Sequence, residues 1–165
     1  ACPAGHGVQV AAAAATSPGA ERTFRHGAAL VAPDGEVLAV GANRRALLAS
    51  GRRIQLHAEL DALLRLPHLD NAAGCRCYVV ELDDFGVGFL DAHPCKGGCR
   101  QGLQIAGVAE AAWTTGSFGA LEVRQVKPNQ LATSNALRYI ERHGGLAPAI
   151  PETKKMAHAG DYAKK

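Results

Sequence analysis

Two short stretches decide the expected fold of this chain: HAELDALL at residues 57–64 and PCKGGC at residues 94–99. Leucines recur at helical spacing through the first stretch, so the pattern predicts a helix over residues 56–66, which a proline then ends. The second stretch begins with proline, which the first helical turn tolerates, and it predicts a helix over residues 94–106. Between them, the apolar run of residues 77–82 predicts a buried strand.

The flanking sequence continues this alternation of strands and helices. Residues 28–40 consist of two apolar runs around a Pro-Asp-Gly turn, which predicts a hairpin. Further strands are expected over residues 108–114 and 121–126, and a last helix over residues 129–143. The pattern is typical of an α/β domain with helices on both faces of its sheet. Because a short glycine turn joins the second helix to the next strand, we expect a right-handed crossover and parallel final strands.

Composition divides the chain into three parts. Residues 1–23 are rich in alanine and glycine and are expected to form a leader or a short helix, with residues 8–16 as the helical candidate. Residues 24–145 contain the strand and helix patterns and are expected to form the one domain that carries the chemistry. Residues 146–165 are rich in proline, lysine and alanine and are expected to be a flexible tail.

Composition and charge limit the classes of protein to which this chain can belong. Hydrophobic residues make up 47% of the chain and charged residues 20%, which is typical of a globular protein. No apolar run approaches the ~20 residues that cross a bilayer, so no membrane partner is expected. The net charge of +3 and the 5% of aromatic residues are low for a dedicated nucleic-acid binder. The five cysteines are an odd number without a secretory signal, so we expect an intracellular protein without a disulfide framework.

The cysteines and the histidine of the two stretches suggest a metal site. Cys95 and Cys99 are four residues apart and so share one face of the expected helix, near its N-terminus, where the helix dipole favours thiolate. Two thiolates and the imidazole of His57 supply three ligands to Zn²⁺ and leave a fourth position for water, which is the pattern of a catalytic zinc. Glu59 follows His57 by two residues and is expected beside that position as a proton carrier, not as a ligand.

Two other interpretations of these residues stay open. Cysteines are often buried in a core, and a histidine often stands at a helix end, without any metal. A structural zinc would need a fourth protein ligand, for which the sequence offers Cys75, Cys77 or His93. Cys75 and Cys77 share one face of the strand region, where such cysteines are usually core residues.

The two stretches together resemble the H-x-E…P-C-x-x-C pattern of zinc deaminases, in which a histidine and two cysteines hold zinc and a glutamate moves protons. The flanks RHGAALVAPDGEVLAVGANRR at residues 25–45 and LQIAGVAEAAWTT at residues 103–115 also resemble the cytidine/deoxycytidylate deaminase superfamily. The resemblance implies a cytidine-deaminase-like three-layer α/β/α fold with a mixed five-stranded sheet, Zn²⁺ as cofactor, and hydrolytic removal of an amine from a nucleobase. Within the superfamily, parallel final strands belong to the deoxycytidylate, tRNA and polynucleotide branches. One departure is that three residues, not two, separate Cys95 from Cys99, a gap that the polynucleotide branch tolerates.

The resemblance also implies contacts to the substrate. Asn43 stands where the family commonly binds the sugar, although asparagine is also common in turns. Ala58, His93 and Phe118 stand where the family lines the base pocket, with an ordinary loop residue as the alternative for His93. We expect Trp113 in the core instead.

Three functions are compatible with these residues. The first is deamination of cytosine to uracil in a free nucleoside or nucleotide, as in the deoxycytidylate branch. The second is deamination of cytosine or adenine within single-stranded DNA, RNA or tRNA. The wider cysteine spacing favours it, as do four arginines in an expected loop, which are either phosphate ligands or solvated: Arg44, Arg45, Arg52 and Arg53. The third is an inactive binding module of the same fold, against which the intact Glu59 argues. Relatives often assemble, so a homo-oligomer is a further expectation.

Overall fold

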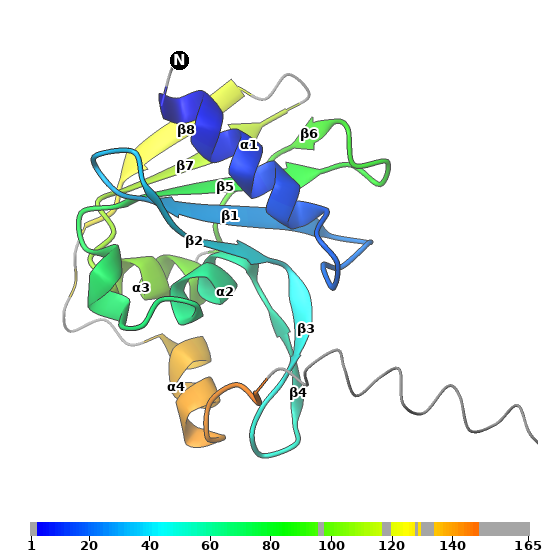
Figure 1. The fold of residues 1–165 in the computed structure, drawn as a ribbon, viewed down its shortest axis with the longest axis vertical. Helices are drawn as coiled ribbons and strands as arrows, with labels where there is room; N and C mark the ends of the chain where they lie inside the picture. The colour runs from blue at the N-terminus through cyan, green and yellow to red at the C-terminus, as the bar shows by residue number, and fades with distance from the viewer. Residues whose placement is uncertain (1–2, 96–97, 117–119, 128, 130–133, 149–165) are drawn as a thin grey trace, which may run out of the picture.

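The computed structural model describes residues 3–95, 98–116, 120–127, 129 and 134–148. Within this part of the chain, a mixed sheet has the strand order β2-β1-β5-β7-β8, with a short strand β6 beside β5 (Figure 1). These strands are β1 (Arg25–Val31), β2 (Val37–Ala42), β5 (Arg76–Leu82), β6 (Phe89–Leu90), β7 (Glu110–Thr115) and β8 (Ala120–Gln125). The helices are α1 (Pro3–Ala15), α2 (Ala58–Leu64), α3 (Gly98–Ile105) and α4 (Asn135–Arg142), with a 3-10 turn at Leu69–Ala72.

Helices cover both faces of the sheet, so the expected three-layer α/β/α arrangement with a mixed sheet is confirmed (Figure 1). Side chains of β1 alternate between two apolar cores. Ala28 and Leu30 pack toward α2 and α3, whereas Ala29 and Val31 pack toward α1. The helix α1 therefore belongs to the layered structure, where the sequence left a leader and a helix as alternatives.

Two glycines set how closely the helices approach the sheet. A Cβ added to Gly27 of β1 would collide with the backbone of Ala11 in α1. A Cβ added to Gly41 of β2 would collide with the backbone of Ala58 and Ala62 in α2. Since the chemistry of the HAE stretch starts in α2, Gly41 helps to fix where that chemistry lies relative to the sheet.

The pairing of the last strands differs from the prediction. The crossover through α3 makes β7 parallel to β5, but β8 runs antiparallel to β7, from Glu110 opposite Gln125 to Thr115 opposite Ala120. The prediction of parallel final strands is therefore wrong. Only four residues connect these two strands, whereas a parallel connection needs about a dozen or more. The antiparallel pair gives no support for placing the chain in the deoxycytidylate, tRNA or polynucleotide branches.

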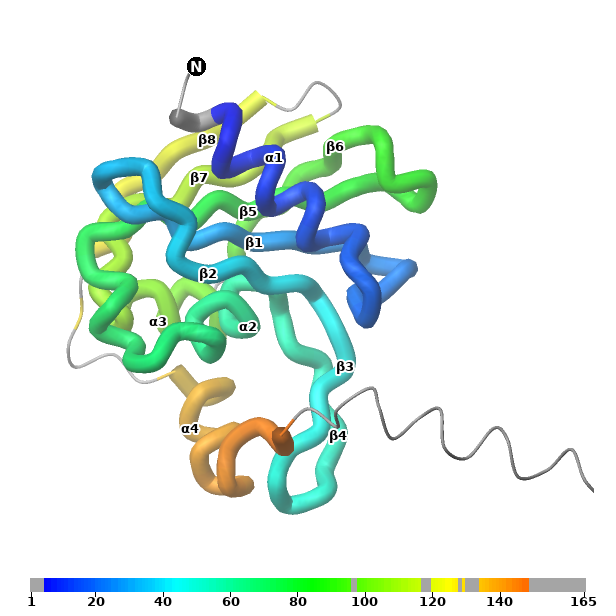
Figure 2. Tube along the Cα trace, in the orientation of Figure 1, coloured from blue at the N-terminus to red at the C-terminus, as the bar shows by residue number. Residues whose placement is uncertain are grey.

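Other boundaries also differ from the expected ones. The expected arginine-rich loop is a second, two-stranded sheet of β3 (Arg44–Leu47) and β4 (Arg53–Leu56), which projects beyond the main sheet beside α4 (Figures 1 and 2). Pro94 and Cys95 are not helical, although the helix was expected to start at Pro94, and α3 is described from Gly98 on. Most of the expected tail, residues 149–165, lies outside the described residues. Within the described residues, no helix has the length and apolar character that a bilayer crossing needs.

Candidate metal centre and cavity

His57 and Glu59 lie at the start of α2, where the helix meets the sheet. His57 is the N-cap residue with an extended backbone, at φ −75° and ψ 151°, and its carbonyl oxygen accepts the N–H of Asp61 at 2.9 Å. Glu59 follows in the first turn, and only 5% of it is exposed. A buried carboxylate beside metal-ligating side chains is a common feature of functional sites.

Cys95 and Cys99 lie on either side of the start of α3. Cys95 precedes α3 and is not helical, whereas Cys99 belongs to the described part of α3 (Gly98–Ile105). The N–H of Cys99 donates to Sγ of Cys95 at 3.4 Å, and the N–H of Arg100 donates to the carbonyl oxygen of Cys95 at 3.2 Å. One N–H group near the helix start, that of Cys99, therefore reaches the Cys95 sulfur, and such a bond favours the thiolate form.

The ligand atoms of His57, Cys95 and Cys99 come together. All of them lie within 4.8 Å of one another, and Nδ1 of His57 is 3.2 Å from Sγ of Cys99. With zinc bonds of 2.0–2.3 Å, tetrahedral ligands lie about 3.5–3.8 Å apart, so this donor set is suitable for zinc. Among the residues that the structure describes, this is the one cluster of three or more such side chains. Cys75, Cys77 and His93 do not join it, so the donor set is that of an open site and not of a closed structural one.

The side chains of Cys95, Cys99 and Glu59 differ in how readily each of them loses its proton. The pKa of Cys95 is lowered to about 5, first because the Cys99 side chain hydrogen-bonds to its sulfur, with further contributions from the Cys99 N–H and from His57. The pKa of Cys99 is raised, because its sulfur faces that of Cys95 and is buried. Burial likewise raises the pKa of Glu59. A divalent cation between the two sulfurs would hold both as thiolates, so the residues fit a zinc ion.

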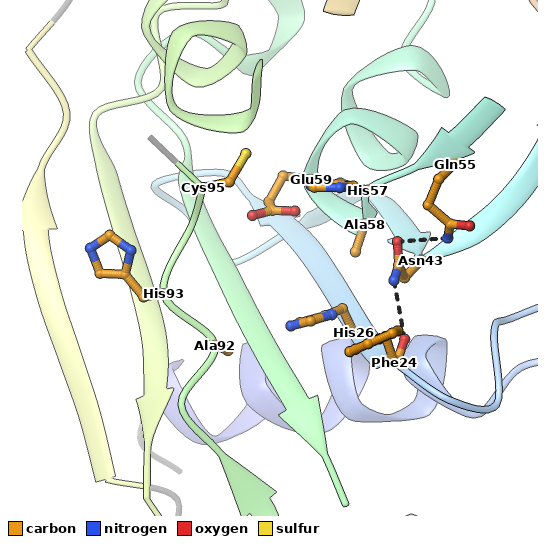
Figure 3. A pocket seen from close by; sticks show the side chains of 10 residues that line it. All are labelled: Phe24, His26, Asn43, Gln55, His57, Ala58, Glu59, Ala92, His93 and Cys95. Atoms are coloured by element: carbon orange, nitrogen blue, oxygen red, sulfur yellow. Dashed lines mark hydrogen bonds between the residues drawn. The ribbon is translucent and has the colours of Figure 1, made fainter. Parts of the chain in front are cut away.

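A cavity of about 400 Å³ opens beside this cluster (Figure 3). This volume lies within the usual range of small-molecule sites. The cavity is lined by Phe24, His26, Asn43, Gln55, His57, Ala58, Glu59, Ala92, His93 and Cys95. The cavity therefore gives a ligand access to the cluster and to Glu59 together.

The residues expected to contact the substrate fall into two groups. Asn43, Ala58 and His93 line the cavity, whereas Phe118 lies outside the described residues. Trp113 is 3% exposed and packs in the core, as expected. The ring of His93 meets the ring of Trp113 edge-on, with centroids 5.0 Å apart, so the core side chain fixes one wall of the cavity.

Hydrogen bonds hold Asn43 in the opposite wall. Its Nδ2 donates to the carbonyl oxygen of Phe24 at 3.2 Å, and its Oδ1 accepts from Nε2 of Gln55 at 3.2 Å (Figure 3). The backbone N–H of Asn43 donates to the carbonyl oxygen of His26 at 3.0 Å. Asn43 is only 7% exposed, so its amide is pre-oriented at the cavity and is not a free turn side chain.

Sequence reasoning missed Phe24, His26, Gln55 and Ala92 as cavity residues. For His26 a signal existed, because it stands two residues before Ala28 and so shares the α2 side of β1. Its Nε2 lies 3.0 Å from Oε2 of Glu81, its partner across β1 and β5. Gln55 carries no comparable signal, because its strand was expected to be a loop.

Comparisons with known proteins identify the family of this chain. Two solved structures resemble the fold, both of RibD from Acinetobacter baumannii: form 1 with a TM-score of 0.41 and 19% identity, and form 2 with a TM-score of 0.39 and 18% identity. Each match covers 86% of this chain and 32% of the other, so the chain spans about a third of the length of those proteins. No curated protein matches the chain. A sequence model of the cytidine and deoxycytidylate deaminase zinc-binding region matches residues 6–115, well over half of the 165 residues. The chain therefore belongs to the cytidine and deoxycytidylate deaminase zinc-binding family.

Proposed function

We propose that this protein is a zinc-dependent hydrolytic deaminase that converts cytosine to uracil in a free nucleoside or nucleotide. One observation carries the proposal: a buried carboxylate, Glu59, lines the same cavity as a three-donor cluster suitable for zinc. Three donors leave a coordination position for water, and a carboxylate beside that position can move its protons.

The reaction consumes one water and releases one ammonia. When bound, zinc supplies a water that is activated for attack at neutral pH. Glu59 takes a proton from this water as its oxygen bonds to C4 of the cytosine ring, and it passes the proton to N3. Glu59 then carries a second proton to the exocyclic nitrogen, the C4–N4 bond breaks, and ammonia leaves a uracil ring.

The other cavity residues would hold and orient the substrate. The amide of Asn43, fixed by Phe24 and Gln55, offers hydrogen bonds to a sugar hydroxyl. His93 lies beside Cys95 on the other side of the cavity and can contact the base. The volume of about 400 Å³ suits one nucleoside-sized ligand.

Product formation tests this proposal directly. The zinc-loaded protein is incubated with cytidine, dCMP and a short cytosine-containing oligonucleotide, and ammonia and uracil products are measured. We expect turnover of cytidine or dCMP, and a loss of about 10²–10⁴-fold in the variant Glu59→Gln at unchanged zinc content. Turnover of the oligonucleotide alone, or full activity of the variant, would contradict the proposal.

A further inference from the structure

The four arginines between residues 44 and 53 lie in different environments. Arg44 is bound to the buried carboxylate of Asp61 at 2.8 Å, and Arg52 donates to the hydroxyl of Tyr139 at 3.3 Å. Arg45 and Arg53 are instead exposed residues of the strands β3 and β4. The four residues therefore cannot act as one cluster, and only the second pair has a position suited to a ligand.

Strand register places Arg45 and Arg53 on the face of the hairpin that carries Gln55. Arg45 is the cross-strand partner of Gln55, and Arg53 precedes Gln55 by two residues. Side chains at such positions share one face of a sheet, whereas Ala46 and Leu56 point to the other face and join the core. Since Gln55 lines the cavity, the exposed face of β3 and β4 continues the cavity wall outward from the metal cluster.

We propose that Arg45 and Arg53 form a subsite for a phosphate monoester at the mouth of the cavity, so that the substrate is a cytosine nucleotide. This inference rests on the proposed deaminase function. Cross-strand neighbours lie about 5 Å apart, so a ligand held at Gln55 is within reach of the Arg45 side chain. Among the described residues that line the cavity, none is a lysine or arginine, so a phosphate held there would need cationic partners beyond the lining, and Arg45 is the cross-strand neighbour of the lining residue Gln55. Guanidinium groups are suited to phosphate because they can donate two parallel hydrogen bonds to it.

Glu21 orients Arg45 without using all of its donors. Oε1 of Glu21 lies 3.3 Å from Nε of Arg45, while the guanidinium has five N–H donors in total. The Arg45 side chain is 77% exposed and that of Glu21 only 25%. The carboxylate therefore fixes one edge of the guanidinium, and its charge at the same time opposes an incoming anion.

The surroundings favour a free nucleotide over a polynucleotide backbone. A polynucleotide carries a phosphate at every nucleotide, and its binding usually needs many Lys and Arg side chains. This surface offers two arginines, and the whole chain has a net charge of only +3. On the other side of the cavity, the exposed Asp91 stands directly before the lining residues Ala92 and His93. A strand that crossed the mouth would meet this negative charge.

The test compares CMP with cytidine in charge-matched variants. We expect Arg45→Ala and Arg53→Ala each to raise KM for CMP about tenfold while kcat/KM for cytidine stays within about twofold. Arg138→Ala, at an exposed position of α4 that does not line the cavity, removes the same charge and should change neither substrate. Glu21→Gln should lower KM for CMP only. Equal effects on both substrates, or no effect in either variant, would overturn the subsite.

A binding measurement separates this inference from the proposed function. UMP and uridine are titrated into the Glu59→Gln protein by calorimetry, which needs no turnover. Tighter binding of UMP that Arg45→Ala abolishes would support the subsite even if no substrate were deaminated. Deamination of cytidine without any preference for phosphate would keep the proposed function and overturn the subsite. Loss of oligonucleotide binding alone in the arginine variants would assign these residues to a polymer and also overturn it.

Discussion

The carboxylate of Asp61 accepts two hydrogen bonds from the guanidinium of Arg44, at 3.0 Å from Nε and 2.8 Å from Nη2. Asp61 is fully buried in α2, two residues after Glu59, and Arg44 directly follows Asn43. The other carboxylate oxygen accepts the N–H of Ala42 at 3.0 Å and bonds from Arg65. One buried charge therefore connects the helix that carries Glu59 to the strand end that carries Asn43.

Asp61→Asn should lower the free energy of unfolding by about 2–4 kcal/mol, because it leaves Arg44 without its charged partner in a largely buried place. Urea unfolding followed by circular dichroism measures this change. The control is Glu122→Gln, which removes an exposed carboxylate paired with Arg124 and should cost less than about 1 kcal/mol. Equal losses in the two variants would show that Asp61 does not connect the two segments.

Cys99→Ser should release zinc, because it removes one of three protein ligands. The matched control is Cys75→Ala, since Cys75 is a buried cysteine outside the cluster. We expect about one zinc per chain in the control and a large loss in Cys99→Ser, measured by elemental analysis after dialysis against a weak chelator. Zinc retained in Cys99→Ser but lost in Cys75→Ala would mean that the metal lies elsewhere.

The sequence pattern was sufficient for features that depend on neighbours along the chain. HAE and the two cysteines open or flank helices, and the crossover through α3 gives the parallel pair β5 and β7. Partners far apart in the sequence were not predictable in the same way. The sequence around Asp61 does not indicate its bond to Arg44, because that bond forms only when the chain has folded and β3 lies against α2.

Errors arose where short segments were interpreted without the geometry of the whole sheet. Gly107 suggested one crossover, but the direction of β8 depends on the short connection after Thr115. Gln55 was assigned to a loop because the surrounding arginines masked the alternation of Ala46, Ile54 and Leu56 toward the core. The position of Gln55 in the cavity wall and the proposed arginine subsite both rest on the strand register of this hairpin, which the sequence pattern did not reveal.

Gly41→Ala should destabilise the protein by about 1–3 kcal/mol and weaken zinc binding, because the added methyl group meets the backbone of Ala58 and Ala62. The helix α2 must then move away from β2, taking His57 and Glu59 with it. The control is Gly5→Ala in α1, where nothing lies within 4 Å and helix propensity predicts a gain of up to about 1 kcal/mol. Thermal unfolding and a zinc titration provide the two readouts, and an unchanged zinc affinity in Gly41→Ala would show that α2 tolerates the shift.

The turn before β6 should lose order as the pH falls. Oδ1 of Asp83 accepts the N–H groups of Phe85 and Val87, each at 3.1 Å, and backbone hydrogen bonds, that from Val87 first, lower the pKa of Asp83. A lowered pKa means that this carboxylate stabilises the fold above its unfolded pKa of about 3.9, and that the contribution is lost as the pH falls through the lower folded value. Asp83→Ala should therefore speed amide exchange at Phe85 and Val87 at pH 6, and the difference from the wild type should shrink as the pH falls through the folded pKa of Asp83, below the unfolded value. Asp84→Ala, at the exposed neighbouring position, should leave that exchange unchanged. If both variants exchanged alike at pH 6, the order of the turn would come from its backbone bonds and not from the Asp83 charge.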